Sequence, residues 1–492
     1  MAAVERSPTL LALESRVSTF ALPNGMRFVV CERHQAPIFS VQMYADVGAY
    51  DEREGETGVA HLLEHLAFKG TQTLGTTDFA AERLALDDCD AAFYALRDAV
   101  AQGAPAGRVG ELREALARTE AAAAVYELPN AYGATLKREG GVGLNAETSF
   151  DSTVFYCSLP SNKLELWFAL ESDRLRAPVF RGMYAEKGVI EEERRLRVDN
   201  SPQGKFQQAF LEAAFDSPYR RPIIGYEHDF DQLGREEVCD FFQRKYGPGA
   251  MTVAIAGDIT PEQVQRLAEE YFGSWEPNPA FEPPSAAAPA RTPSPRTVRR
   301  SPAEISMAAP ASPLLYMGYE RGSRTSPDAI PISLFASLLS NGRTSPFYTD
   351  LVEPRRALAA ALTPTFPGEK HGTMSLLIGL PVEGQSIGKL HSELVREVDM
   401  VLKPRAPRAL EDGLARAKRQ SRAARRRALA SNSACAGALA SSEALGSDLG
   451  WRELVERAER SEATTPGEVR DVCRRVFAES NLRAVGSMTR EA

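Results

Sequence analysis

Two histidines four residues apart could bind a metal ion. The stretch GVAHLLEHLAFKGT, residues 58–71, contains two of the six histidines of the chain. Residues four apart project from one face of a helix, so His61 and His65 lie side by side, with Glu64 next to both. A catalytic zinc takes three protein ligands, often imidazoles, and keeps a fourth position for water. The order His-x-x-Glu-His is the inverted zincin motif, in which the glutamate is the general base.

A metal is not required for this helix to pack. Apolar side chains surround the histidines, so an amphipathic helix with two half-buried histidines is the plain alternative. Zinc needs a third ligand, and carboxylates are concentrated in AEKGVIEEERRLRVDNSPQGK, which begins at Ala185. Spacing alone does not choose among them, and such a group is usually a solvated helix face. The candidates are Glu186, Glu191, Glu192 and Glu193.

Composition limits the classes of protein. A chain of 492 residues with 43% hydrophobic content predicts two or more domains. The net charge of -8 argues against nucleic-acid binding, and we interpret the basic run 416–427 as a solvated helix face. Six cysteines without a Cys-x-x-Cys pair predict reduced thiols. No apolar run has membrane-spanning length, and the first residues lack the features of a targeting signal. We therefore expect a soluble protein of the cytoplasm, or of an organelle matrix or stroma after removal of a leader.

The chain divides near its middle. Residues 276–302 are rich in proline and lack helical or strand periodicity, which is typical of a semi-rigid linker. The flanking domains are predicted at 15–275 and 303–492. Both end in an amphipathic helix, a short break and a strand, which suggests two copies of one architecture. Helices and alternating strands intermix in both halves, so the predicted class is α+β.

One helical segment looks added to this plan. Residues 77–135 are rich in strong helix formers on both sides of a turn at 103–107 that contains glycine and proline. This pattern predicts a helical hairpin. It could be a docking element or a spacer, and the spacer is the simpler interpretation.

These motifs together resemble the pitrilysin-type (insulinase-like, M16) zinc metallopeptidases, which include mitochondrial processing peptidase and its bacterial relatives. The similarity extends through ALPNGMRFVV, HLLEH, GVGLNAETSFDSTVFYCSLP and AEKGVIEEERR, and it is weaker in the second half. The hairpin resembles an insertion in one bacterial-type branch of that family. The resemblance implies two similar domains, each a mainly antiparallel sheet packed by helices.

The resemblance also implies roles for individual residues. The third zinc ligand of the family heads a Glu-x-x-Val segment, which matches Glu186 here. His61, His65 and Glu186 would then hold Zn2+, and Glu64 would take a proton from the attacking water. Family members bind substrate as a strand added to a sheet edge, which matches Asn145 and Ala146. The alternative for Asn145 is a strand-end residue that satisfies a local turn.

Two functions from different classes follow. The first is a zinc-dependent endopeptidase that cleaves extended peptides or small unfolded polypeptides. The second is a non-catalytic core or assembly subunit of a processing or respiratory-type complex. A zinc hydrolase with a non-peptide substrate is a third, more distant reading. The complete set of His61, Glu64, His65 and Glu186 favours the peptidase, because a structural subunit has no need of it.

The second half differs from the family pattern at two positions, which implies a partner subunit. Active relatives supply an arginine and a tyrosine from a Leu-Arg-x-x-x-x-Leu-x-Tyr-like segment, and the matching segment here is 352–360. It places Glu353 at the arginine position and Ala360 at the tyrosine position. We therefore expect a second, similar subunit that supplies both side chains in a heterodimer, with a homodimer as the alternative. A shifted register could instead use Arg355, Arg356 and Tyr348.

Overall fold

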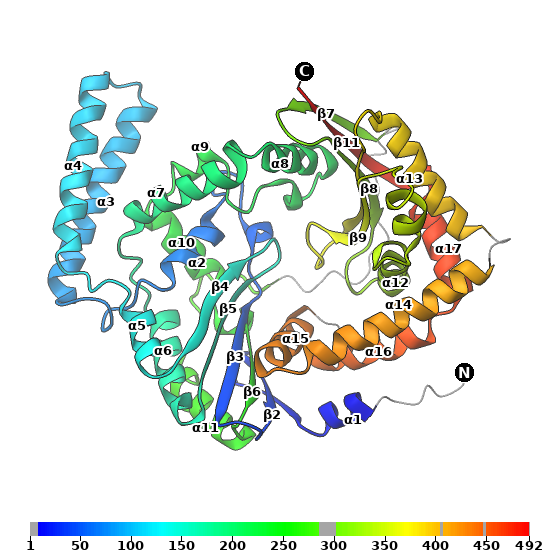
Figure 1. The fold of residues 1–492 in the computed structure, drawn as a ribbon. Helices are drawn as coiled ribbons and strands as arrows, with labels where there is room; N and C mark the ends of the chain where they lie inside the picture. The colour runs from blue at the N-terminus through cyan, green and yellow to red at the C-terminus, as the bar shows by residue number, and fades with distance from the viewer. Residues whose placement is uncertain (1–7, 285–301, 404–406, 446–448, 492) are drawn as a thin grey trace.

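The computed structural model describes residues 8–284, 302–403, 407–445 and 449–491, and it contains two β-sheets with helices packed on them (Figure 1). Most of the linker expected over 276–302 lies outside these residues.

The first sheet has six strands in the order β1-β2-β6-β3-β5-β4. Neighbouring strands are antiparallel except for the parallel pair β2 and β6. Every residue of β6, MTVAIAG, is buried, which explains why its sequence is apolar on both faces. The bounds are β1 Val17–Ala21, β2 Arg27–Glu32, β3 Ile38–Ala45, β4 Val142–Thr148, β5 Thr153–Pro160 and β6 Met251–Gly257.

The second sheet repeats this plan with five strands in the order β7-β11-β8-β10-β9. Its one parallel pair, β7 and β11, takes the place of β2 and β6. The prediction of two similar α+β halves is therefore confirmed. The bounds are β7 Ala303–Ala309, β8 Leu314–Arg321, β9 Ala359–Phe366, β10 Thr373–Leu380 and β11 Leu482–Arg490.

Helices surround both sheets. Those of the first half are α1 Pro8–Glu14, α2 Val59–Leu66, α3 Phe79–Ala101, α4 Ala106–Ala124, α5 Ala131–Arg138, α6 Leu164–Arg176, α7 Met183–Arg194, α8 Pro202–Ala214, α9 Glu227–Phe230, α10 Arg235–Lys245 and α11 Pro261–Phe272. Those of the second half are α12 Ala329–Ser340, α13 Ile387–Leu402, α14 Pro407–Ala428, α15 Asn432–Leu445, α16 Glu453–Ala463 and α17 Pro466–Val476.

Each half covers part of the sheet of the other. Helix α8 packs on β7 and β11 of the second sheet, where Phe210 contacts Met374 and Ala484. Helix α15 packs on β3 and β6 of the first sheet, where Leu439 belongs to one apolar cluster with Ala254 (Figure 1). Each half thus keeps its own main core, and smaller apolar clusters join the two halves.

Helices α3 and α4 form the predicted hairpin and project from the side of the first half (Figure 1). The base of the hairpin is held by a buried ion pair, in which Arg181 Nε lies 2.6 Å from Glu82 Oε1. Arg235 adds contacts to Asp87 and Asp90 of α3. The hairpin is thus fixed rigidly to the segment that leads into α7.

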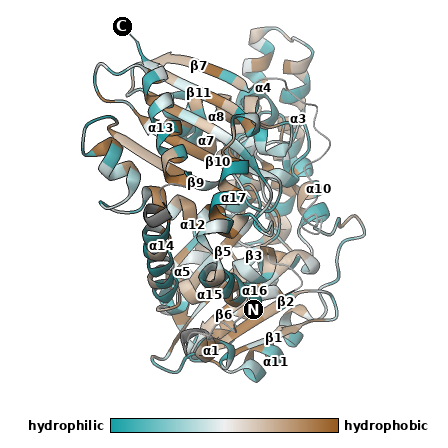
Figure 2. Cartoon of the chain, turned by 90° about the vertical axis from the view of Figure 1, so that its right-hand side faces the viewer, coloured by the Kyte–Doolittle hydropathy of each residue, from teal (hydrophilic) through white to brown (hydrophobic). Residues whose placement is uncertain are grey.

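The distribution of hydrophobic and hydrophilic residues matches this arrangement of strands and helices. Figure 2 shows hydrophobic residues along β2 and β6 and hydrophilic residues along α14, which carries the basic run 416–427. Among the described helices, none combines the length and apolar character needed to cross a membrane.

Candidate metal centre

Helix α2 presents the histidine motif from a fixed position. Its apolar side chains are buried in the first core, and its N-cap is Gly58 with φ of +91°. A Cβ atom at Gly58 would lie 2.8 Å from the carbonyl oxygen of Ile224, so only glycine fits there. The carboxylate of Glu52 accepts a hydrogen bond from the amide of Ala60 at 3.0 Å, which anchors the first turn.

Helix α7 supplies two carboxylates on one face. It buries Met183, Lys187 and Ile190 and packs against α2. Glu186 and Glu193 are seven residues apart, which is close to two helical turns, so both side chains lie on the side that faces α2.

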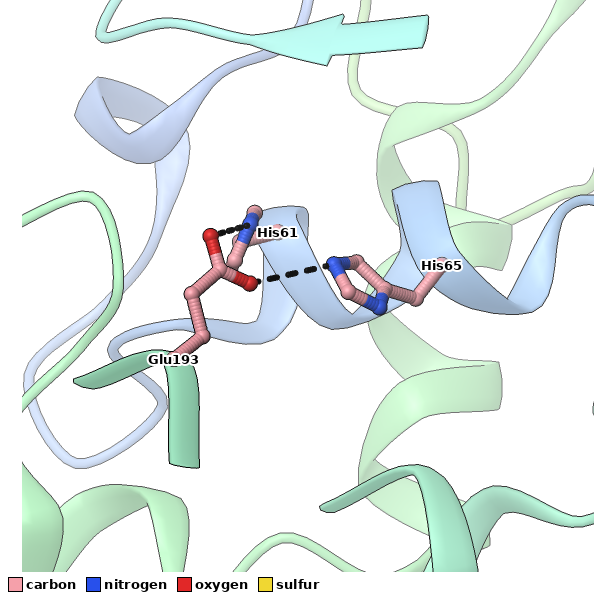
Figure 3. Close-up of side chains that lie close together, drawn as sticks. All are labelled: His61, His65 and Glu193. Atoms are coloured by element: carbon pink, nitrogen blue, oxygen red, sulfur yellow. Dashed lines mark ion pairs between the residues drawn. The ribbon is translucent and has the colours of Figure 1, made fainter. Parts of the chain in front are cut away.

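Glu193 reaches both imidazoles. Its Oε1 lies 3.7 Å from Nε2 of His61, and its Oε2 lies 3.6 Å from Nε2 of His65 (Figure 3). One potential ligand atom from each of the three residues lies within 4.8 Å of the others. Ligands about 2 Å from a tetrahedral zinc lie about 3.3 Å from one another. Two imidazole nitrogens and one carboxylate at these separations fit a zinc ion.

Glu186 has a different position from the one expected for a third ligand. Its Oε1 accepts a hydrogen bond from Nδ1 of His65 at 2.9 Å, and its Oε2 lies 2.7 Å from Nζ of Lys69. Glu186 thus contacts the edge of the His65 ring that points away from Glu193. The two glutamates are separated by about 10 Å along the axis of α7. Only one of them therefore lies opposite the Nε2 atoms of His61 and His65.

Burial and ion pairing set the charges of the site. Burial is the main cause that lowers the pKa of His61 to about 3, so its ring is neutral and its nitrogen is free to bind a metal. Burial also acts to lower the pKa of His65, but the hydrogen bond and charge of Glu186 outweigh it and raise that pKa. The hydrogen bond from His65 is the main cause that lowers the pKa of Glu186 to about 2.

Glu64 lies between the histidines on α2 and is partly exposed. Within the described part of the chain, its carboxylate has no hydrogen-bond or ion-pair partner. It is therefore available to accept a proton from a molecule that enters the site.

Strand β4 is an open edge of the first sheet. It pairs with β5 on one side only, and it contacts α2. Asn145 is exposed, and its Nδ2 donates a hydrogen bond to the hydroxyl of Tyr156 at 3.2 Å. The side chain of Ala146 is buried in the core, so Ala146 can offer a ligand only its backbone.

The segment 352–360 lies in the second half. Glu353 follows the short helix η6 (Phe347–Val352), and Ala360 belongs to β9, opposite Gly379 of β10. Arg355 adopts a positive φ of +57°, and both Arg355 and Arg356 are exposed. None of the hydrogen bonds or ion pairs found among the described residues joins this segment to the histidines of α2.

Sequence reasoning included Glu193 among four candidate carboxylates but, through the family resemblance, selected Glu186, and it did not single out Lys69. The spacing from Glu186 to Glu193 was a usable signal, because it puts these two on the same helix face and leaves Glu191 and Glu192 off it. Lys69 lies three residues after the end of α2, and no spacing in the sequence indicates its contact with Glu186.

Two profiles of one protein family match this chain. The profile of the family described as insulinase (peptidase family M16) matches residues 27–86 and 123–227. The intervening residues belong to the α3–α4 hairpin, which marks the hairpin as an addition to the family plan. The profile described as the peptidase M16 inactive domain matches residues 232–419.

Individual proteins also resemble this chain in sequence. The zinc protease PqqE of Helicobacter pylori is 24% identical over 70% of this chain and 65% of that protein. A probable mitochondrial-processing peptidase subunit beta of Schizosaccharomyces pombe is 26% identical over 54% of this chain and 46% of that protein. The chain thus spans less than two thirds of the length of these relatives.

The fold comparison extends over the whole chain. The crystal structure of a protease from Helicobacter pylori superposes with a TM-score of 0.74 at 20% identity, covering 97% of this chain and 99% of that one. Together, the two profiles and the shared fold show that the chain belongs to the M16 family of insulinase-like peptidases.

Proposed function

We propose that this chain is a zinc-dependent endopeptidase whose metal ligands are His61, His65 and Glu193. The observation that carries the proposal is the convergence of the Glu193 carboxylate on both Nε2 atoms, beside the unpaired carboxylate of Glu64. Glu186, the ligand expected from the resemblance, is proposed instead to orient His65. A carboxylate on the outer nitrogen of a ligating histidine is a common arrangement around zinc.

The residues around the site would have different roles in peptide hydrolysis. Bound zinc supplies a Lewis acid that lowers the pKa of water toward neutrality and polarises a carbonyl. Glu64 accepts a proton on its carboxylate and delivers it to the nitrogen of the leaving amine. Glu186, itself paired with Lys69, holds the His65 ring by its Nδ1 edge, which fixes the tautomer with a free Nε2.

Substrate would bind along the open edge of β4. Main-chain hydrogen bonds to a free edge tolerate many side chains, so the ligand would be an extended peptide. Asn145 is exposed on this edge and is proposed to contact the substrate backbone, with Ala146 contributing its main chain. Replacing Asn145 with Ala should raise KM, whereas Tyr156→Phe, which removes only its hydroxyl partner, should leave KM close to wild type.

A second candidate function rests on the second half of the chain. The profile matched there describes an inactive domain, and Glu353 and Ala360 stand where an arginine and a tyrosine were expected. A chain of this kind could serve as a non-catalytic subunit. The compartment expected from the sequence, cytoplasm or organelle, stays a prediction.

Glu64→Gln separates these functions. The variant should keep about one zinc per chain but lose peptide cleavage, because it removes the base and retains the ligands. Metal content and cleavage of a mixed peptide pool would be measured on the same preparations, with and without a chelator. Glu262→Gln, on an exposed turn of α11, is the matched control. Wild-type cleavage by Glu64→Gln would exclude the proposed mechanism, and a wild-type protein that binds no zinc would favour the subunit.

A further inference from the structure

The loop between β9 and β10 reaches from the second half of the chain into the first. We call residues 368–371 the bridging loop. The carboxylate of Asp151, in the turn that joins β4 to β5, accepts hydrogen bonds from the amides of Glu369 at 2.6 Å and Lys370 at 3.1 Å. The hydroxyl of Tyr219 donates to the other oxygen of Asp151 at 2.6 Å.

The close approach leaves no room for a larger residue at the start of the loop. A Cβ atom at Gly368 would lie 2.5 Å from the ring of Tyr219 and 2.6 Å from the carboxylate of Asp151. The first half therefore encloses the bridging loop tightly, as a binding site encloses a ligand.

Two side chains of the bridging loop, one buried and one half-buried, contact the same segment of the first half. Nζ of Lys370 lies 2.6 Å from Oδ1 of Asp46. The side chain of Lys370 is 3% exposed and that of Asp46 is 8% exposed. The ring of His371 stacks on Tyr50, with 3.8 Å between centroids and 13° between planes. An ion pair this buried is costly to form and costly to break, so it specifies one arrangement of the two halves.

The residues that hold the bridging loop also support the metal helix. Asp46 follows β3, and Tyr50 lies in the short helix η1 (Ala49–Asp51), which leads to Glu52. Glu52 anchors the first turn of α2 through the amide of Ala60. Arg221 donates hydrogen bonds to the carbonyl oxygens of Tyr50 and Glu52, so hydrogen bonds hold this segment in place between the bridging loop and α2.

The same segment supports the substrate edge. The amide of Ala49 donates to the carbonyl oxygen of Ser149 at 3.1 Å, and the amide of Tyr50 donates to that of Phe150 at 2.8 Å. Ser149 and Phe150 begin the turn between β4 and β5. The bridging loop thus contacts a segment of the first half that is linked to both α2 and β4.

We propose that Lys370 and His371 are positioning residues, through which the second half of the chain holds α2 and the β4 edge in register with each other. This inference rests on the proposed peptidase function. It gives the second half a part in catalysis even though it contributes no ligand to the metal site. Loss of the bridging contacts should lower kcat, because small displacements of supporting residues commonly cost tenfold to a hundredfold in activity or metal affinity.

The test uses the full chain and two independent variants. His371→Leu removes the stacking contact without creating an unpaired charge, and Asp46→Asn combined with Lys370→Met removes both charges of the pair. Lys370→Arg is the conservative variant. The readouts are kcat and KM for a peptide, zinc affinity by chelator competition, and hydrogen exchange of residues 59–66 and 142–153.

Both variants should lower kcat about tenfold or more and speed exchange in α2, with KM changed much less, and Lys370→Arg should recover most of kcat. Arg475→Met breaks an ion pair to Asp328 inside the second half and should change none of these readouts. Wild-type kcat, zinc affinity and α2 exchange in both bridging variants would overturn the inference. If the wild type cleaves no peptide, either alone or mixed with a second, similar subunit, the proposed function fails, while zinc affinity and exchange still decide the role of the bridging loop.

Discussion

Two glutamates on one face of α7 have different surroundings. Glu193 faces both Nε2 atoms and pairs with the exposed Arg197, which can move away when a cation binds. Glu186 instead pairs with Nζ of Lys69 and with Nδ1 of His65. Their chemistry is the same, so their roles differ only through position.

Substitution of each glutamate should separate these roles. Glu193→Gln removes a proposed ligand and should abolish stoichiometric zinc binding at micromolar free zinc. Glu186→Gln removes an orienting partner and should weaken zinc affinity by about tenfold to a hundredfold. Both affinities would be measured by competition with a chromogenic chelator. The reverse order of the two effects would return the third ligand to Glu186, as the sequence first suggested.

A buried carboxyl group in the second half predicts a pH dependence of stability. Burial is the main cause that raises the pKa of Glu397 to about 7, with the nearby Asp350 acting in the same direction. The folded chain therefore keeps a proton between pH 4.5 and 7 that the unfolded chain loses. The associated stability is present below pH 4.5 and is lost as the pH rises through 7. Its full size is on the order of 3 kcal/mol.

Glu397→Gln should remove this dependence. Relative to the variant, the wild type should lose stability between pH 5 and pH 7.5, as measured by urea unfolding at both values. Glu383→Gln, an exposed acid in the same half, should follow the wild type. A stability difference between wild type and Glu397→Gln that does not change with pH would contradict the assigned pKa.

The motif residues were predictable because they depend on local geometry. A spacing of four on a helix places His61 and His65 together whatever surrounds them. The choice between Glu186 and Glu193 was not predictable from spacing, since both share one helix face. It depends on how far α7 is displaced along its axis relative to α2, and that displacement is set by packing between elements distant in the sequence.

At the scale of elements, a buried ion pair is one of the contacts that anchor the hairpin of α3 and α4. Arg181 is 1% exposed, and besides Glu82 it donates hydrogen bonds to the carbonyl oxygens of Lys69 and Thr71. The side chain thus joins the hairpin to the loop after α2. Arg181→Met leaves Glu82 charged and buried, so it should destabilise the chain by about 3–5 kcal/mol.

Thermal unfolding would measure this effect. Arg118→Met breaks an exposed pair with Glu114 on the same hairpin and should cost less than about 1 kcal/mol. Equal small losses in both variants would show that the hairpin is held by its apolar contacts alone.

The elements themselves were largely predictable, and their partners were not. Strong helix formers around a glycine-containing turn indicated the hairpin, and the repeated helix–break–strand endings indicated two similar halves. No sequence pattern indicated that α8 packs on the second sheet and α15 on the first. An amphipathic helix shows that it will cover a surface, but its sequence does not say which of two sheets provides that surface.

At the scale of the molecule, the described residues place one candidate metal centre in the first of two similar halves. The matching position of the second half lacks the histidine motif, and the family profile found there describes an inactive domain. A relative of similar sequence is named as the beta subunit of a processing peptidase, a name that implies a partner chain for that protein. The composition of the working assembly is therefore a question that sequence and fold raise together.

Our last prediction is that this chain alone binds zinc but cleaves peptides poorly. Glu353 and Ala360 occupy the positions where the resemblance implies an arginine and a tyrosine that stabilise the substrate carbonyl. Loss of a preorganised donor of this kind costs on the order of a hundredfold or more in rate. A second, similar subunit that carries both side chains should restore turnover when mixed with this chain, and size-exclusion chromatography should show a heterodimer. The alternative donors Arg355, Arg356 and Tyr348 would be replaced by alanine as a control. Full activity of the isolated chain that survives this triple substitution would rule out the requirement for a partner, whereas full activity lost on substitution would assign the donors to this chain.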